Sequence, residues 1–109
     1  MAFDEGLAQR TREVLVDLPG FVEKKMFGGI GFMLRGNMAC GVNGNELIVR
    51  VGPANYEQAL GMPYTRPFDM TGRPMRGWVM VAPAGLESDA GLQDWVQRGV
   101  EFALSLPEK

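Results

Sequence analysis

Histidine is absent from the 109-residue chain, and cysteine occurs once, at Cys40. Without histidine the sequence lacks the commonest general base and the commonest transition-metal ligand, so Ser-His-Asp and Cys-His catalysis are excluded. One cysteine cannot form an internal disulfide, and without histidine it does not make a zinc site. We therefore expect no catalytic residues, no cofactor and no metal, and we expect a cytoplasmic location, where thiols stay reduced.

Long apolar runs and a strong basic charge are absent too. No run approaches the 18 or so residues of a membrane span, and the first ten residues have no basic start before an apolar stretch, so we expect neither a membrane segment nor a signal peptide. Eleven basic and 13 acidic residues give a net charge of −2. This balance disfavours direct binding to nucleic acid, which normally needs many cations on one face. The length predicts a single domain over residues 1–109.

Apolar residues at helical spacing predict three helices. The first covers residues 4–18 and has acids near its N-terminus, where the helix dipole favours them. The second covers 53–61, with a proline in its first turn and Gly61 at its end. The third covers roughly 89–106 and is capped by Ser88.

Between the first two helices the apolar period changes to two, which predicts short strands. The four candidates are FVEKKMF, IGFMLR, MACGV and ELIVRV, all within residues 21–51. Residues 77–82 predict another strand, and 64–70 could hold an edge strand at best because of Pro67. The expected fold is a two-layer α+β domain. Its antiparallel β-meander is packed by helices on one face, in the order α-β-β-β-β-α-β(β)-α.

The register of two hairpins decides which side chains share a face of the sheet. Asn43-Gly44 predicts a two-residue loop, because a type I′ turn needs positive φ at both central positions. At 35–37 we prefer a three-residue loop with a bulge, since a slip of one residue would turn the apolar side chains over. The face expected to meet the helices carries Ile30, Phe32, Leu34, Met38, Cys40, Val42, Leu47, Val49 and Val51. The opposite, open face carries Gly29, Gly31, Met33, Arg35, Ala39, Gly41, Glu46, Ile48 and Arg50.

Five glycines fall within residues 24–42, KKMFGGIGFMLRGNMACGV. A phosphate-binding loop leads into a helix, whereas GGIG leads into a strand and no Gly-Lys-Ser/Thr follows. We therefore interpret these glycines as structural. Gly28-Gly29 form a tight turn, and Gly31 and Gly41 leave a bare patch that a backbone or a helix can approach closely.

Two groups of side chains are candidates for contact with a partner. Met33, with three methionines of the segment 62–75, either forms an adaptable binding surface or fills the core. RPFDMTGRPMRGW, residues 66–78, either recognises an anion or a partner through its arginines or is an ordered connection that exposes them. The candidate partner surface consists of Met33, Ala39, Gly41, Ile48, Arg66, Arg73 and Arg76.

Three segments, KKMFGGIGFMLRGNMACGV, ELIVRVG and RPFDMTGRPMRGWVMV, carry a family resemblance over about residues 8–105. Together they resemble the N-terminal domain of the TfoX/Sxy family of bacterial competence regulators. The motif residues that match include Lys25, Met26, Phe27, Gly28, Gly29, Gly31 and Arg50. The resemblance implies a stand-alone copy of a two-layer α+β domain without known catalytic residues, auxiliary to transcriptional activation and working with an activator protein.

Two hypotheses about function follow. The first is a non-enzymatic regulatory or protein-interaction domain, which binds either a protein partner or a second copy of itself as a homodimer through the open face of the sheet. The alternative is a domain or enzyme that binds a small anionic ligand through the Arg-rich segment 66–76. A closed pocket lined by those arginines would favour the alternative, and a flat patch would favour the first.

Overall fold

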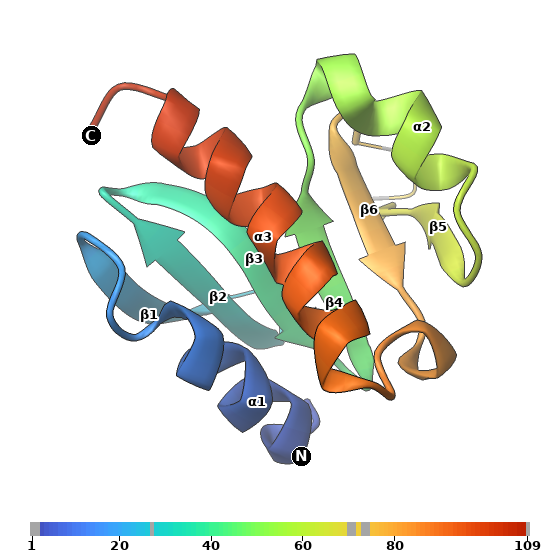
Figure 1. Cartoon of the computed structure of the whole chain (residues 1–109), viewed down its shortest axis with the longest axis horizontal. Helices are drawn as coiled ribbons and strands as arrows, with labels where there is room; N and C mark the ends of the chain where they lie inside the picture. The colour runs from blue at the N-terminus through green and yellow to red at the C-terminus, as the bar shows by residue number, and fades with distance from the viewer. Residues whose placement is uncertain (1–2, 27, 70–71, 73–74, 109) are drawn as a thin grey trace.

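The computed structural model describes residues 3–26, 28–69, 72 and 75–108, and in that part of the chain three α-helices and six strands form two layers (Figure 1). The α+β fold class and the order of elements are therefore as predicted. The helices are α1 (Glu5–Leu15), α2 (Tyr56–Leu60) and α3 (Asp89–Ser105), with 3₁₀ turns η1 (Pro53–Asn55) and η2 (Pro83–Gly85). The strands are β1 (Phe21–Met26), β2 (Gly29–Leu34), β3 (Asn37–Asn43), β4 (Glu46–Arg50), β5 (Thr65–Pro67) and β6 (Trp78–Val81).

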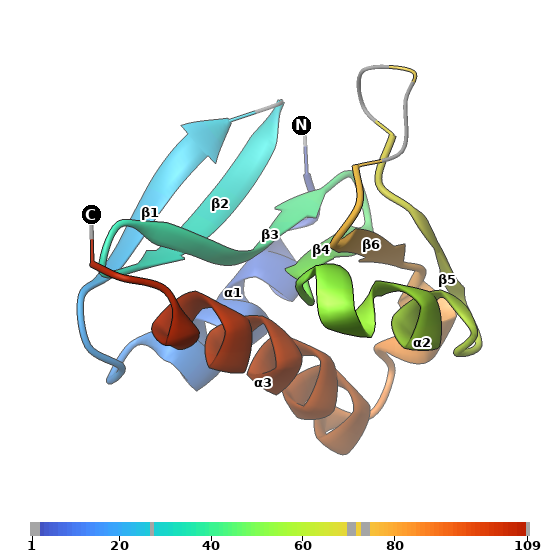
Figure 2. The same ribbon diagram turned by 90° about the horizontal axis from the view of Figure 1, so that it is seen from above.

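The strands form one antiparallel sheet in the order β1-β2-β3-β4-β6-β5. The first four strands are the predicted meander. β5 is a three-residue edge strand that ends at Pro67, as expected for a residue that cannot donate to a ladder. Figure 2 shows α1, α2 and α3 on one side of the sheet, while the β1–β2 hairpin extends toward the other side.

Side-chain caps determine where the two longer helices begin. The Asp4 carboxylate accepts a hydrogen bond from the backbone N–H of Leu7 at 3.0 Å, and α1 then ends at Leu15, three residues before the predicted end. The Ser88 hydroxyl likewise accepts from the backbone N–H of Gly91 at 3.0 Å, and α3 ends one residue before its predicted end. Both helices thus follow the sequence signals closely.

The main core lies between the helices and the sheet. Phe32, Cys40, Leu47 and Val49 are all completely buried there, so the face predicted to meet the helices is confirmed at these positions. α3 approaches β3 so closely that a side chain at Gly99 would collide with the backbone oxygen of Ala39. This contact seats the longest helix on the middle of the sheet.

The β2–β3 turn differs from the prediction. It is a two-residue loop, Arg35-Gly36, with φ of 53° and 83°, and not a three-residue loop. The extra residue sits inside the strand pair, where the register shifts between Phe32 and Met33. Phe32 still pairs with Cys40 as predicted, because the shift lies beyond that pair. A loop with positive φ at both positions matches the twist of the strands, so the bulge absorbs the odd residue.

Because of this bulge, Met38 and Ala39 lie on the opposite faces of the sheet from those predicted. Ala39 was predicted on the open face, but it is completely buried in the main core, and this prediction is wrong. Met38 was predicted to meet the helices, but it packs with Ile48 and Met80 on the opposite face, and this prediction is wrong too. One inserted residue is sufficient for both errors, since side chains alternate along a strand.

The β3–β4 loop is displaced by one residue from the predicted Asn43-Gly44. Asn43 pairs with Glu46, so the loop is Gly44-Asn45, and Gly44 alone has positive φ, at 57°. The register therefore moves by two positions, and Val42 lies opposite Leu47. A shift of two residues keeps every side chain on its face, so the predicted apolar face survives this error.

Candidate functional site

The face of the sheet away from the helices carries a second apolar cluster. Its buried members are Met38, Ile48, Phe68 and Met80, and its partly buried members are Met26, Met33, Met75 and Trp78. We call these eight residues the methionine face. Thioether side chains are flexible and polarizable, and this composition is typical of adaptable contact surfaces. In the described part of the face, the four buried residues form a small core, and the four partly buried residues can contact a partner.

Strand pairing and two glycines position the methionines. Gly31 and Gly41 pair across β2 and β3, and both are buried. A side chain at Gly31 would meet the sulfur of Met26 at 2.8 Å, and one at Gly41 would meet the methyl carbon of Met38 at 2.8 Å. The bare patch predicted at these glycines is thus occupied by methionines of the same chain.

The chain also covers part of this face with its own β5–β6 connection. Phe68 is only 1% exposed, its backbone oxygen accepts from the N–H of Met75 at 2.9 Å, and its ring lies 6.0 Å from that of Trp78. Ile48 beneath is 2% exposed. Ile48 and Gly41, two members of the candidate partner surface, are therefore buried within this chain and offer no direct contact to a partner.

The remaining part of the methionine face is accessible at its β1–β2 side. Met33 is partly exposed, and its strand neighbour Val22 is 49% exposed. Lys24 pairs with Gly31, so it lies on the same face and is exposed. The family-motif residues Lys25, Met26, Gly28 and Gly29 form the end of this hairpin, and Phe27 lies outside the described residues.

Arg66, another member of the candidate partner surface, is engaged within the chain. Its Nε and Nη2 donate to the Glu46 carboxylate of β4 at 3.1 and 2.6 Å, across the intervening strand β6, and its Nη1 lies 3.5 Å from Asp69. These hydrogen bonds and charges raise the pKa of Arg66. Arg76 is exposed in the turn before β6, and Arg73 lies outside the described residues. The described arginines of segment 66–76 therefore do not converge on one anion site.

Arg50 occupies a different setting at the end of β4. Its guanidinium carbon lies 5.1 Å from the ring centre of Trp78 and 5.2 Å from that of Phe102 on α3. The side chain is partly buried, and this burial lowers its pKa. Arg50 thus lies at the margin of the methionine face, where the sheet and the helical layer meet. Trp78, the strand partner of Arg50, is also a partly buried member of the methionine face.

Charges separate between the two layers. The three helices carry six carboxylates and three arginines, whereas the six strands carry two glutamates and four basic residues. On the methionine face both nearby carboxylates, Glu46 and Asp69, are already bonded to Arg66. At the accessible β1–β2 side of this face, the charged residue of the strands is the exposed Lys24.

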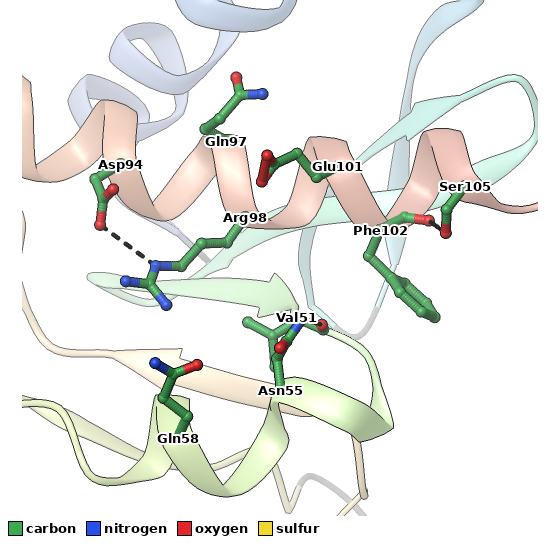
Figure 3. A pocket seen from close by; sticks show the side chains of 9 residues that line it. All are labelled: Val51, Asn55, Gln58, Asp94, Gln97, Arg98, Glu101, Phe102 and Ser105. Atoms are coloured by element: carbon green, nitrogen blue, oxygen red, sulfur yellow. Dashed lines mark hydrogen bonds and ion pairs between the residues drawn. The ribbon is translucent and has the colours of Figure 1, made fainter.

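A polar hollow of about 460 Å³ lies between α3 and the η1–α2 segment, and it was not predicted from the sequence (Figure 3). Arg98 donates to Asp94 at 3.3 Å within it and stacks on Trp95 at 4.9 Å. Its walls hold Asn55, Gln58, Asp94, Gln97, Arg98, Glu101 and Ser105 beside Val51 and Phe102. The polar residues spaced three or four apart on α3 were the available signal. None of the described members of the candidate partner surface lines this hollow.

Neither the Cys40 thiol nor the described acidic side chains form a reactive or metal-binding site. Complete burial raises the pKa of the Cys40 thiol to about 12, so it behaves as a small apolar side chain, as predicted. Among the described residues, no group of three Cys, Asp or Glu side chains could hold a metal ion. The described helices are all too short or too polar to cross a membrane.

Comparison with known proteins identifies a family for nearly the whole chain. The family described as TfoX N-terminal domain matches residues 13–103 of the 109. Comparison with curated proteins and with solved structures gave no significant match.

Proposed function

Since this chain belongs to the TfoX N-terminal domain family, we propose that it is a regulatory domain that acts by binding a protein partner through the accessible side of its methionine face. The family is not a known enzyme family. The observation that carries the proposal is the partly exposed Met33 beside Val22, on a face that the helices leave uncovered. Apolar side chains gathered on an accessible face commonly mark an interaction site.

The proposed role is auxiliary to transcriptional activation, with a transcription activator as the partner. This assignment of the partner rests on the family, and the described arginines of segment 66–76 do not form a site for a small anion. Of the described arginines in the segment proposed for an anion site, Arg66 is bonded to the Glu46 carboxylate, and Arg76 is exposed in a turn and lines none of the hollows around the described residues. A competence-related regulatory role is therefore preferred here over the binding of a small anion.

A second copy of the chain was the other partner anticipated from the sequence. Two copies joined through the accessible β1–β2 side of this face would each present Lys24 to the other, and like charges in contact are unfavourable. We therefore propose a different protein, and not a homodimer, on this surface.

The experiment is capture of proteins from the source cells on the immobilised full chain, with two matched variants. Met33→Glu places a charge on the proposed surface, whereas Val16→Glu places the same charge at the end of α1, where Val16 is 53% exposed. Quantitative mass spectrometry is expected to find proteins that the parent and Val16→Glu retain and Met33→Glu loses. Equal retention by both variants, with circular dichroism showing both folded, would refute the proposed surface.

A further inference from the structure

Arg50 differs from the other partly buried arginines in what it contacts. Arg10, Arg12 and Arg98 each donate to a carboxylate, at 3.3, 2.6 and 3.3 Å. Within the described ranges, Arg50 has no carboxylate within reach and contacts two aromatic rings instead. Aromatic faces hold the flat guanidinium in place but do not use its N–H donors.

The orientation of Arg50 follows from elements far apart in the chain. Trp78 comes from β6, the strand next to β4, and Phe102 comes from the last turns of α3. A guanidinium held this way has already lost side-chain freedom before any ligand arrives, so a carboxylate would be bound at a smaller entropic cost. Planar, bidentate recognition of a carboxylate is the contact for which arginine is best suited.

Arg50 adjoins the methionine face directly. Trp78 pairs with Arg50 on one side, and its ring lies 6.0 Å from Phe68 on the other. A ligand that covers Trp78 can therefore touch the thioethers and reach the guanidinium together. Lys24 adds a second cation on the same face, near Met26 and Met33.

We propose that the partner presents an apolar segment with acidic side chains to the methionine face, and that Arg50 receives one of its carboxylates. This inference rests on the proposed function, because it specifies the chemistry of the same partner. Among the described residues Lys24 and Arg50 form no ion pair, and the methionines beside them are apolar. These two cations and the apolar surface match a segment of that composition, and they disfavour a second copy of the same face.

The test uses the full chain with ¹³C-methyl-labelled methionine and synthetic amphipathic peptides as probes. Each peptide carries leucines at helical spacing. The first peptide has glutamates between the leucines, the second has glutamines in the same places, and the third has lysines. Met26, Met33, Met38, Met75 and Met80 report on the methionine face, while Met62, which packs against the main core, is an internal control. The glutamate peptide should shift methyl signals of the first group and leave Met62 unchanged.

Variants of two stacked arginines separate a specific carboxylate contact from general charge. Arg50→Gln should weaken binding of the glutamate peptide about 10- to 100-fold, the usual effect of losing a hydrogen bond between charged groups. Arg98→Gln, which also removes a stacked arginine, should leave the affinity unchanged, and Arg50→Lys should restore only part of the loss because lysine lacks the planar fork. Thermal unfolding verifies that each variant is folded.

Each contrary outcome has a definite meaning. Equal binding of the glutamine and glutamate peptides, no shift with the glutamate peptide, or equal effects of Arg50→Gln and Arg98→Gln would overturn the proposed acidic chemistry. Methyl shifts that depend on protein concentration without any peptide would show a second copy on the face and would overturn it as well. If cell capture still depends on Met33 in those cases, the proposed function stands and only the nature of the partner is wrong.

Discussion

The paired glycines of the methionine face allow a sharp test of how the sheet is packed, through Gly41→Ala and Gly31→Ala. The two residues lie opposite each other on neighbouring strands, and neither has positive φ, so alanine is compatible with the backbone at both. Alanine at position 41 would place its methyl group 2.6 Å from the backbone oxygen of Ile30. At position 31 the obstacles are atoms of the flexible Met26 side chain, at 2.8 to 3.3 Å.

The expected magnitudes differ because one obstacle is backbone and the other is a side chain. Replacing glycine by alanine within a strand normally gains about 0.5–1 kcal/mol. At position 31 this gain is offset by the displacement of Met26, so the free energy of unfolding should stay within about 1 kcal/mol of the parent value. At position 41 the β2–β3 ladder must move, which costs about 1–3 kcal/mol for an overpacked site and exceeds the gain, so a net loss of up to about 2.5 kcal/mol is expected.

Urea titration followed by circular dichroism measures both variants under one set of conditions. The unfolding slope with denaturant should be the same for both, since the surface exposed on unfolding hardly changes. If Gly41→Ala is as stable as Gly31→Ala, the close approach of the Ile30 oxygen is wrong. A change of the Met26 methyl signal in Gly31→Ala would independently place that side chain over the glycine.

Three further perturbations follow from the packing. Phe32→Ala removes a completely buried ring from the main core and should cost about 3–5 kcal/mol in urea titration; a cost under about 1 kcal/mol would contradict its position. Arg12 donates to Glu23 at 2.6 and 2.7 Å, and this hydrogen bond lowers the pKa of the Glu23 carboxyl from its ordinary value. The pair therefore stabilises the fold above the ordinary pKa of a glutamate, and its contribution is lost as the pH falls through the lowered pKa. Arg12→Gln should therefore destabilise by up to about 1 kcal/mol at pH 7 and by less at pH 3, and an unchanged difference between the two pH values would count against the pair. Cys40, with its pKa raised to about 12, should resist a thiol reagent at pH 8 in the folded protein and react rapidly in denaturant; equal rates in both states would show that it is accessible.

Local signals in the sequence were sufficient for the existence of the three helices and for the order of helices and strands along the chain. Asp4 and Ser88 mark the helix starts because their side chains satisfy backbone N–H groups within three residues. Alternating apolar residues identify strands for the same local reason, and Phe32 and Cys40 lie on the predicted face. These features depend on neighbours along the chain, and such neighbours can be read without the fold.

The bulge at Ala39 could not be located from the sequence. A three-residue loop and a two-residue loop with a bulge accommodate the same number of residues, and both place Phe32 opposite Cys40. In the fold, Gly99 of α3, 60 positions further along the chain, packs against the backbone of Ala39 on the helical side of the sheet. Local patterns carry no information about that distance, so the positions of Met38 and Ala39 were exchanged.

The candidate site was decided by tertiary structure for the same reason. The sequence pointed to the methionines, to Arg50 and to Arg66 as residue types suited to contact. Only the folded chain shows that Glu46 engages Arg66, 20 residues away, and that Trp78 and Phe102 enclose Arg50. Whether an arginine can bind a partner depends on whether a carboxylate of its own chain already pairs with it. Strands and helices from distant parts of the chain determine which carboxylates lie near each arginine.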